Sequence, residues 1–516
     1  MERRKFLQSA AVVPASGILA STIAGCESNP TQGVPAGISP FQHGVASGDP
    51  QQNRVILWSR VSPPQTDPDT ALPTRWWISK EESGASPVAQ GELLARAEHD
   101  FTLKVDATGL APDQSYYYAF EHAGHRSRVG RTRTLPAAGT SLGGSHPVRL
   151  AVTSCANYPQ GYFNAYRHIA EDPNLNAVLS LGDYLYEYAE GEYGEGAALG
   201  RIPEPTHEIL SLADYRLRHA QHKADNDLQA AHAAHPWIVI WDDHESANDS
   251  WLDGAQNHNP EKNEGSWSTR KAAAVKAYYE WMPIRELPNG LFRHFRFGQL
   301  ADLVMLDTRL AGRDKQAEAN DLETARSTER TLLGPIQEQL FFDHLSATSS
   351  DQVRWKLVGQ QIVFAPWSDA DQLLNPDSWD GYQASRNKVL THLENGGIDD
   401  VIILSGDVHS SWGMNVPNST RTSSQAIELV TPAVSSPPLA SASPQTQALV
   451  ERAPQEQSHI KYAEGLNNGY LIVGLQQDSV QAQWYSTGPR TERSNDPVLQ
   501  KTLVSLPGTN QLTELA

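Results

Sequence analysis

The sequence predicts a multi-domain protein of mixed α+β and α/β class, in which a small fibronectin-like or immunoglobulin-like β-sandwich precedes a larger α/β domain. At 516 residues the chain is too long for one ordinary hydrophobic core. Before residue 135 the apolar runs are short, rich in aromatic and β-branched residues, and separated by turn residues. After residue 147 apolar strands alternate with longer amphipathic segments, which is typical of an α/β fold.

Residues 1–25 are expected to be an export signal and not part of the fold. RRKFL, from Arg3 to Leu7, leads into a mildly apolar stretch and resembles a twin-arginine signal. The residues that end at Cys26 resemble a lipoprotein cleavage site, so Cys26 is a candidate lipid anchor; the alternative is an ordinary peptidase cut nearby. Residues 26–40 are polar and rich in Pro and Gly, as in a tether. We therefore expect export by the twin-arginine route to the periplasm or cell surface.

The β-sandwich is assigned to residues 41–136. Its predicted strands are 54–61, 74–79, 101–105, 115–121 and 127–134. Residues 109–118 resemble the corner of fibronectin-type domains, in which a tyrosine hydroxyl bonds back to the turn. A stretch rich in Gly, Ser and Pro, residues 135–147, marks the domain boundary.

The α/β domain is assigned to residues 148–516. Its predicted strands are 148–153, 177–181, 237–241, 301–306, 355–365 and 401–405. Its predicted helices include 165–171, 212–234, 269–280, 333–345 and 385–394.

Charge and hydropathy exclude several classes of partner. The formal net charge of -19 disfavours nonspecific binding to nucleic acid or anionic membranes, so no nucleic-acid patch is expected. Past the leader no run of about 18 apolar residues could form a transmembrane span. We expect a monomer.

Four predicted strands end in polar residues that can bind metals. These ends carry Ser154-Cys155, Gly182-Asp183 with Tyr186, Asp242-Asp243-His244-Glu245 with Asn248, and Gly406-Asp407 with His409. In α/β folds ligands bind beyond the carboxyl ends of strands, so the four ends are expected to meet in one pocket. Because buried carboxylates need a compensating charge, the pattern predicts a metal centre.

The donor types narrow the choice of metal. Thiolate and phenolate suit ferric iron, whereas carboxylate and amide oxygens suit a hard divalent ion such as calcium, manganese or magnesium. Only two of 18 histidines, His244 and His409, fall within the four motifs, which argues against a di-zinc centre. Asp183 is placed to bridge two ions. Cys155, alone in the expected mature chain apart from Cys26, is a packed thiol, a nucleophile or a metal ligand.

Eight motifs together resemble those of the PhoD-like alkaline phosphatases and phospholipase D-type phosphodiesterases. The chain is also similar to the purple acid phosphatases of the calcineurin-like metallophosphoesterase superfamily. The motifs are residues 44–50 (GVASGDP), 154–155 (SC), 182–187 (GDYLYE), 214–216 (DYR), 225–233 (DNDLQAAHA), 241–245 (WDDHE), 306–309 (LDTR) and 406–409 (GDVH).

The resemblance implies a β-sandwich followed by a layered α/β/β/α catalytic domain that holds Fe³⁺ and Ca²⁺. The residues implied on the iron side are Cys155, Asp183, Tyr186 and His409. Those implied on the second side are Asp183, Asp243, Asn248 and Asp407, with Asp242 as the alternative to Asp243. Tyr215 and Arg216 are implied as further iron or phosphate contacts. The chain departs from the family pattern at residues 222–229 (HKADNDLQ) and 246–249 (SAND).

The predicted reaction is metal-assisted hydrolysis of phosphoric esters, with Asp183 and His244 as catalytic residues. His244 would protonate the leaving group, and its alternative role is a hydrogen-bonded partner of Asp242 or Asp243. The substrates expected are phosphomonoesters, phosphodiesters or both, from small phosphoesters to phospholipid head groups; a phospholipase D-like phosphodiesterase is the first alternative. A non-catalytic surface-binding lipoprotein is the rival from another class.

Overall fold

A computed structural model describes residues 38–64, 70–141, 147–288, 290–367, 373–494 and 496–514. The predicted export signal, Cys26 and most of the predicted tether lie outside the described residues. No helix within the described ranges is long and apolar enough to cross a membrane. The predicted order of a β-rich region followed by an α/β region is confirmed.

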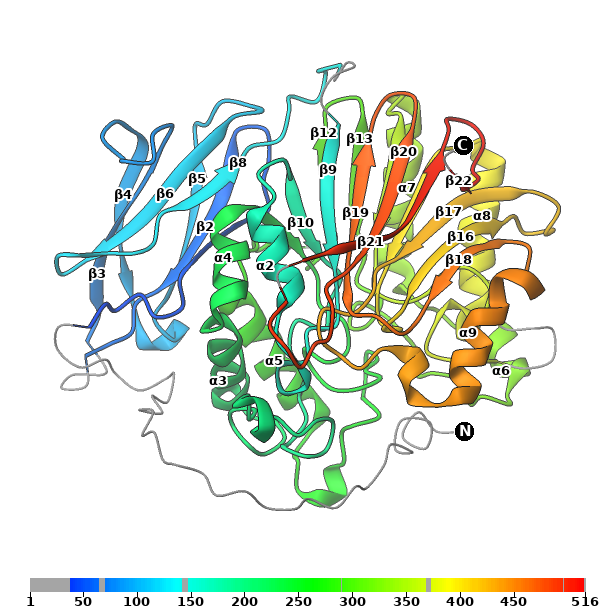
Figure 1. Cartoon of the computed structure of the whole chain (residues 1–516), viewed down its shortest axis with the longest axis horizontal. Helices are drawn as coiled ribbons and strands as arrows, with labels where there is room; N and C mark the ends of the chain where they lie inside the picture. The colour runs from blue at the N-terminus through cyan, green and yellow to red at the C-terminus, as the bar shows by residue number, and fades with distance from the viewer. Residues whose placement is uncertain are drawn as a thin grey trace.

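The largest sheet has ten strands in the order β22-β21-β20-β19-β9-β10-β11-β1-β2-β5 (Figure 1). Strands β9, β10, β11 and β1 are parallel to their neighbours at its centre, and the outer strands pair antiparallel. The bounds of its central strands are β9 Val148–Thr153, β10 Ala177–Ser180, β11 Pro236–Val239 and β1 Val45–Gly48. The outer strands are β2 Arg54–Arg60, β5 Thr102–Thr108, β19 Gly469–Leu475, β20 Val480–Ser486, β21 Val498–Ser505 and β22 Thr513–Glu514.

The second sheet has seven strands in the order β12-β13-β14-β15-β17-β16-β18. Their bounds are β12 Arg293–Phe297, β13 Ala301–Met305, β14 Trp355–Gly359, β15 Val401–Ser405, β16 Ser411–Pro417, β17 Ser424–Val430 and β18 Ile460–Glu464. Alternate side chains of this sheet enter different cores, because a strand points successive residues to opposite faces. Leu357 and Ile402 join the core shared with the ten-stranded sheet, whereas Val358 and Ile403 face the covering helices.

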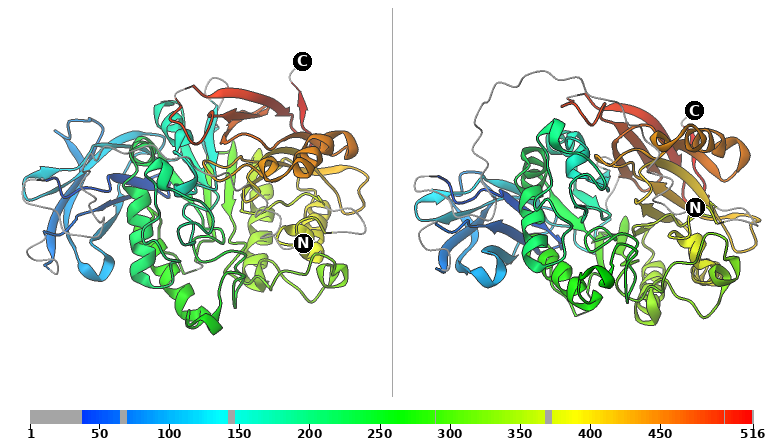
Figure 2. Two further views of the ribbon diagram at one scale, coloured as in Figure 1. Left: turned by 60° about the horizontal axis from the view of Figure 1, so that its bottom comes forward. Right: turned by 90° about the horizontal axis from the view of Figure 1, so that it is seen from below.

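Helices cover the outer faces of both sheets (Figures 1 and 2). Those on the side of the ten-stranded sheet are α2 Asn164–Glu171, α3 Leu212–Lys223, α4 Asn226–Ala234 and α5 Trp267–Trp281. Those on the side of the seven-stranded sheet are α7 Gly334–Ser350 and α8 Gln383–Gly396, and α6 Leu322–Arg326 and α9 Pro444–Glu456 are peripheral. The result is an α/β/β/α arrangement.

The N-terminal region is a sandwich that shares a sheet with the rest of the molecule. Its second sheet has the order β4-β3-β6-β7, with β8 paired to β6. The bounds are β3 Leu72–Ser79, β4 Pro87–Ala95, β6 Ser115–His122, β7 His125–Arg126 and β8 Gly130–Arg133. Its core lies against β2 and β5, which continue through β1 into the ten-stranded sheet. The expected tyrosine corner is present: the Ala111 amide donates to the Tyr116 hydroxyl at 2.8 Å.

Several boundaries differ from the sequence prediction, and two of the differences have a clear physical cause. The segment predicted as one helix over residues 212–234 is broken between α3 and α4, where the Asp225 carboxylate accepts hydrogen bonds from the amides of Asp227 and Leu228 and begins a new helix. The strand predicted over 355–365 ends at Gly359, after which the side chains of Gln360 and Gln361 bond to backbone carbonyls and other polar groups.

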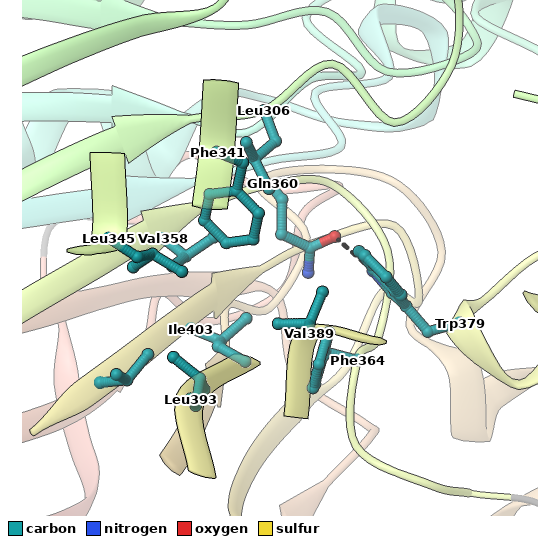
Figure 3. Close-up of a pocket in the computed structure, with 11 residues that line it drawn as sticks. Leu306, Phe341, Leu345, Val358, Gln360, Phe364, Trp379, Val389, Leu393 and Ile403 are labelled. Carbon is teal, nitrogen blue, oxygen red and sulfur yellow. Dashed lines mark hydrogen bonds between the residues drawn. The ribbon is translucent and has the colours of Figure 1, made fainter. Parts of the chain in front are cut away.

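A small apolar cavity of about 10 Å³ lies between the seven-stranded sheet and helices α7 and α8 (Figure 3). Apart from Gln360, whose carbonyl oxygen accepts from Trp379 Nε1 at 3.1 Å, its walls are hydrocarbon or aromatic rings. It has room for about one water molecule. This cavity belongs to the core, away from the polar strand ends.

Candidate metal centre

The polar strand ends meet at one edge shared by the two sheets. Strands β9, β10 and β11 are parallel neighbours, and β15 belongs to the facing sheet. A bridge between Ser154 and Ala433 joins the sheets at this edge. The metal-binding candidates that follow the four strands are Cys155, Asp183, Asp242 and Asp407.

The backbone of this edge is strained at the candidate residues. Cys155, Asp183, Asp407 and His409 all have positive φ angles, of 60°, 53°, 64° and 52°. Each costs on the order of 1–3 kcal/mol for a residue other than glycine, and such strain concentrates at functional sites. The sharp turns direct side chains inward at the point where the strands end.

A first group of ligand atoms comes from Cys155, Asp183 and His409, all within 4.8 Å of one another. The Tyr186 hydroxyl donates to Asp183 Oδ2 at 3.0 Å and lies 3.2 Å from His409 Nε2. His409 Nδ1 is 3.1 Å from the Pro437 carbonyl, so Nδ1 carries the proton and Nε2 presents its lone pair to the group. The set offers a thiol, a carboxylate, an imidazole and a phenol.

Two further groups adjoin the first. One consists of Asp183, Asp243 and His244, and the other of Asp242, Asp243 and Asp407; the ligand atoms of each lie within 4.8 Å of one another. All five residues are buried. Asp183 belongs both to the first group and to the second, which is the position of a carboxylate that bridges two ions.

Burial makes these groups costly without a cation. Burial, with the neighbouring carboxylates, raises the pKa of Asp183 and of Asp242 well above the usual value. Asp183 Oδ1 and Asp242 Oδ2 have no hydrogen-bond partner within the described residues. Burial and the charge of Asp183 also raise the pKa of the Cys155 thiol. A positive ion would stabilise all three charged forms, so the donor set fits a metal centre.

Arg309 supplies a buried positive charge at the centre. It is fully buried, its Nε pairs with Asp242, and its Nη1 donates to Asp377 at 2.8 Å. Its Nη2 lies 3.4 Å from Asp243 and 3.5 Å from Asp407. Sequence motifs located this residue, but only the fold indicates its role, because the partners come from distant segments.

Glu187 holds His244 in place. Its Oε2 lies 2.7 Å from His244 Nδ1, and its Oε1 accepts from the Asn248 amide and from Asn257 Nδ2, both at 2.8 Å. Burial lowers the pKa of His244, but the charges of Asp243, Asp183 and Glu187 outweigh it and raise the pKa well above the usual value. Because Nδ1 of His244 contacts Glu187, Nε2 is the ring nitrogen that faces the other ligand atoms.

Glu245 ties two of the strand ends together. Its carboxylate accepts hydrogen bonds from the amides of Asp183, Tyr184 and Asp242 at 2.6–3.1 Å. Gly182 allows this approach: with φ at 98°, a Cβ there would lie 2.4 Å from Asp242. Sequence reasoning placed Glu245 in a motif but assigned it no role.

The remaining sequence-predicted residues make hydrogen bonds outside the three ligand groups. Asn248 is buried, and its Nδ2 donates a hydrogen bond to Gln256 Oε1 at 3.1 Å. The Tyr215 hydroxyl donates to the Ser246 carbonyl and accepts from Arg270 Nε at 3.1 Å. Arg216 forms a bidentate pair with the Glu280 carboxylate, at 2.7 Å on both oxygens.

An aromatic pocket adjoins the centre at Tyr186. Its other aromatic walls are Tyr158, Tyr188, Tyr193 and His222. The Tyr186 ring also lies against the ring of His244, with centroids 4.2 Å apart. The pocket has a volume of about 10 Å³, so the rings beside His244 are closely packed.

Known proteins resemble nearly the whole chain. The family model described as PhoD-like phosphatase matches residues 150–484, and the model of the PhoD-like phosphatase N-terminal domain matches residues 26–136. Alkaline phosphatase D of Bacillus subtilis (strain 168) is 39% identical over 438 residues, which are 80% of this chain and 72% of that protein. A solved structure of PhoD superposes with a TM-score of 0.83 at 34% identity, over 94% of this chain and 93% of that one.

Proposed function

Because this chain belongs to the PhoD-like phosphatase family, whose members hydrolyse phosphoric esters with the help of metal ions, we propose that its reaction takes place at the buried cluster around Asp183. The observation that carries the proposal is Asp183 itself. Its carboxylate belongs to two adjacent groups of ligand atoms and has one oxygen without a hydrogen bond within the described residues.

Two kinds of ion suit the two sides of the cluster. Cys155, Asp183, Tyr186 and His409 form the side for Fe³⁺, because thiolate, phenolate and imidazole are donors to a transition metal. Asp183, Asp243, Asn248 and Asp407 form the side for Ca²⁺, since their side chains offer oxygen atoms. Asp242 is the less favoured alternative to Asp243, because it already pairs with Arg309. Bound together, such ions supply charge neutralisation of the phosphate and a more acidic water.

The chain's own residues orient and protonate the substrate. His244 donates a proton from Nε2 to the leaving oxygen, while Glu187 holds Nδ1 and keeps the ring charged. Arg309 lies behind the carboxylates and limits their mutual repulsion. Tyr186 fixes Asp183 through a hydrogen bond at 3.0 Å.

The substrates are phosphomonoesters and phosphodiesters, including small phosphoesters and phospholipid head groups. The rings of Tyr186, Tyr188 and Tyr193, which contact His244, support substrates whose leaving group packs against an aromatic surface. A phospholipase D-like preference for diesters is the alternative. It predicts faster cleavage of diesters than of the matching monoesters.

For export and for the domain boundaries, we propose what the sequence predicts. We propose a twin-arginine signal at residues 1–25, a lipid anchor at Cys26, a tether at 26–40, a sandwich at 41–136 and a catalytic domain at 148–516. The two family models, which match residues 26–136 and 150–484, support this division. The protein would act as a periplasmic or surface-bound monomer.

Elemental analysis together with phosphoester assays tests this proposal. Purified wild type should contain iron and calcium and hydrolyse mono- and diester substrates. Asp183→Ala should lose both metals and activity, whereas Cys155→Ala should lose iron and activity. Arg216→Gln is the matched control, because the ion pair of Arg216 with Glu280 predicts that its metals and activity are retained. Full iron content in Cys155→Ala would mean that Cys155 is not an iron ligand.

A further inference from the structure

A second cluster of metal-binding side chains lies at the edge of the seven-stranded sheet. His294 in β12, Asp302 in β13 and His344 in α7 offer ligand atoms within 4.8 Å of one another. These residues belong to none of the motifs at the polar strand ends. β12 is the outermost strand of its sheet, so the cluster is separate in sequence and topology from the centre around Asp183.

The register of the sheet explains how the three residues meet. Arg296 is directly opposite Asp302 in the antiparallel pair β12–β13, and His294 is two positions from Arg296 on the same face. Helix α7 packs on β13 and adds His344 to that face. Three chain segments therefore converge on one point.

One carboxylate oxygen of Asp302 faces both imidazoles. Asp302 is 4% exposed, and its Oδ2 pairs with Arg296 at 3.0 Å. Its Oδ1 has no hydrogen-bond partner within the described residues, and lies 3.3 Å from His344 Nε2 and 3.9 Å from His294 Nδ1. A buried carboxylate oxygen normally accepts a well-aligned hydrogen bond, and the contact with His344 lacks that alignment, whereas a cation between the three side chains would contact all of them.

The spacing fits a tetrahedral ion. Bonds of about 2.0–2.1 Å to nitrogen and oxygen place neighbouring ligand atoms about 3.4 Å apart in a tetrahedron. The Asp302–His344 separation already matches. The His294 side chain must approach by about half an ångström, and because it is 60% exposed its ring can rotate. Thr348 Oγ1, 3.4 Å from His344 Nε2, makes only a long contact, which the ring can give up.

We propose that His294, Asp302 and His344 bind a zinc ion that fastens the edge strand β12 to helix α7. Two imidazole nitrogens and one carboxylate oxygen are ligands that zinc prefers, and water completes the tetrahedron. Arg296 does not cancel the local charge, since it also approaches Asp351, at 3.5 Å, and leaves the two carboxylates with one net negative charge. An ion at this position would fix the last strand of the sheet to the helix that covers it.

Zinc content and thermal stability test the proposal on the full, metal-loaded protein. Wild type equilibrated with ZnSO₄ and freed of excess should hold one zinc more than His294→Ala, and only wild type should gain in Tm when zinc is added. The zinc dissociation constant of this site should weaken by more than about tenfold in His294→Ala. His294 is largely exposed, so this variant is expected to fold.

Two controls separate this zinc from the catalytic metals. His392→Ala changes a nearby histidine outside the cluster and should keep the additional zinc. Asp183→Ala should keep it too, while the phosphatase activity of His294→Ala stays at the wild-type level. Equal zinc content and equal Tm gain in wild type and His294→Ala would overturn the proposal, as would loss of the same zinc in His392→Ala.

Discussion

Under the proposed mechanism, Glu187 acts on the reaction through His244. Its carboxylate is fully buried and accepts from Asn248 and Asn257 while it holds His244 Nδ1. Ions bound at Asp183 and Asp243 would neutralise the two other charges that raise the pKa of His244. Glu187 is then the carboxylate that keeps this imidazole protonated.

Glu187→Gln should therefore lower kcat and shift its pH dependence. An acid with a raised pKa stays protonated until the pH passes that pKa, so removing the negative partner moves the alkaline limb of kcat to lower pH. We expect kcat to fall by about 10- to 100-fold, as for other residues that orient a catalytic group. Steady-state rates across pH, with metal content as the control, measure this. If Glu187→Gln keeps its full metal content and the alkaline limb of its kcat does not shift, Glu187 has only a packing role.

Sequence reasoning at this scale identified residue types better than their partners. Cys155, Asp183 and Asp407 could be singled out because each follows an apolar strand. Arg309 could not be placed, because its carboxylate partners lie more than 60 residues away along the chain. Arg216 looked suitable for phosphate, but its position on α3 directs it to Glu280 on α5.

At the scale of elements, helix α4 ends on a buried histidine. His235 follows Ala234 directly, and its Nε2 lies 2.8 Å from the Ile169 carbonyl at the end of α2. Burial lowers the pKa of His235 to about 4 from a usual 6.5. The neutral ring therefore connects two helices that cover the ten-stranded sheet.

This histidine should make the fold sensitive to acid. The unfolded chain binds the proton near pH 6.5 and the folded chain only near pH 4, so the stability it contributes is present above pH 6.5 and lost as the pH falls towards 4. The full difference is about 3 kcal/mol. His235→Gln keeps a donor for Ile169 but cannot be charged. Between pH 7 and pH 4, the free energy of unfolding in urea should fall less for His235→Gln than for wild type. The control His125→Gln should lose as much stability as wild type. Parallel losses in all three proteins would contradict this.

Element types followed from the sequence more reliably than element ends. Apolar periodicity located the central strands and most helices. The break between α3 and α4 depends on one Asp225 side chain that can cap a helix, which periodicity does not register. Strand β14 ends at Gly359, earlier than predicted. The next two side chains turn to other segments: Gln360 donates to the Ser405 hydroxyl and Gln361 to the Leu306 carbonyl.

At the scale of the whole molecule, the sandwich and the catalytic region form one continuous structure. β1 pairs parallel with β11 and antiparallel with β2, so the ten-stranded sheet crosses the predicted domain boundary. At Gly48 the backbone of β1 passes close to the backbone of Pro283. Only glycine fits there, because a Cβ would lie 2.2 Å from the Pro283 carbonyl oxygen. Sequence patterns did not predict the shared sheet, since nothing in the short run 45–48 indicates which strand it will pair with.

Asp49 fastens this junction electrostatically. Its carboxylate accepts from Arg293 Nη1 at 2.7 and 2.9 Å and from the Arg285 amide at 2.7 Å. Both Asp49 and Arg293 are almost fully buried. Removing one partner of a buried pair costs about 3–5 kcal/mol, because the other charge is left uncompensated.

Asp49→Asn should therefore destabilise both regions together. Asparagine tolerates the φ of 44° at this position, so the substitution removes charge without adding backbone strain. Asp113→Asn is the matched control: its φ of 52° is also positive, but its pair with Arg133 is exposed and contributes at most about 1 kcal/mol. In urea unfolding followed by hydrogen exchange, amides of β6 in the sandwich and of β15 in the catalytic region should lose protection by the same free energy in Asp49→Asn. Loss confined to β6 would mean that the sandwich unfolds independently, in which case the continuous sheet does not couple the two regions.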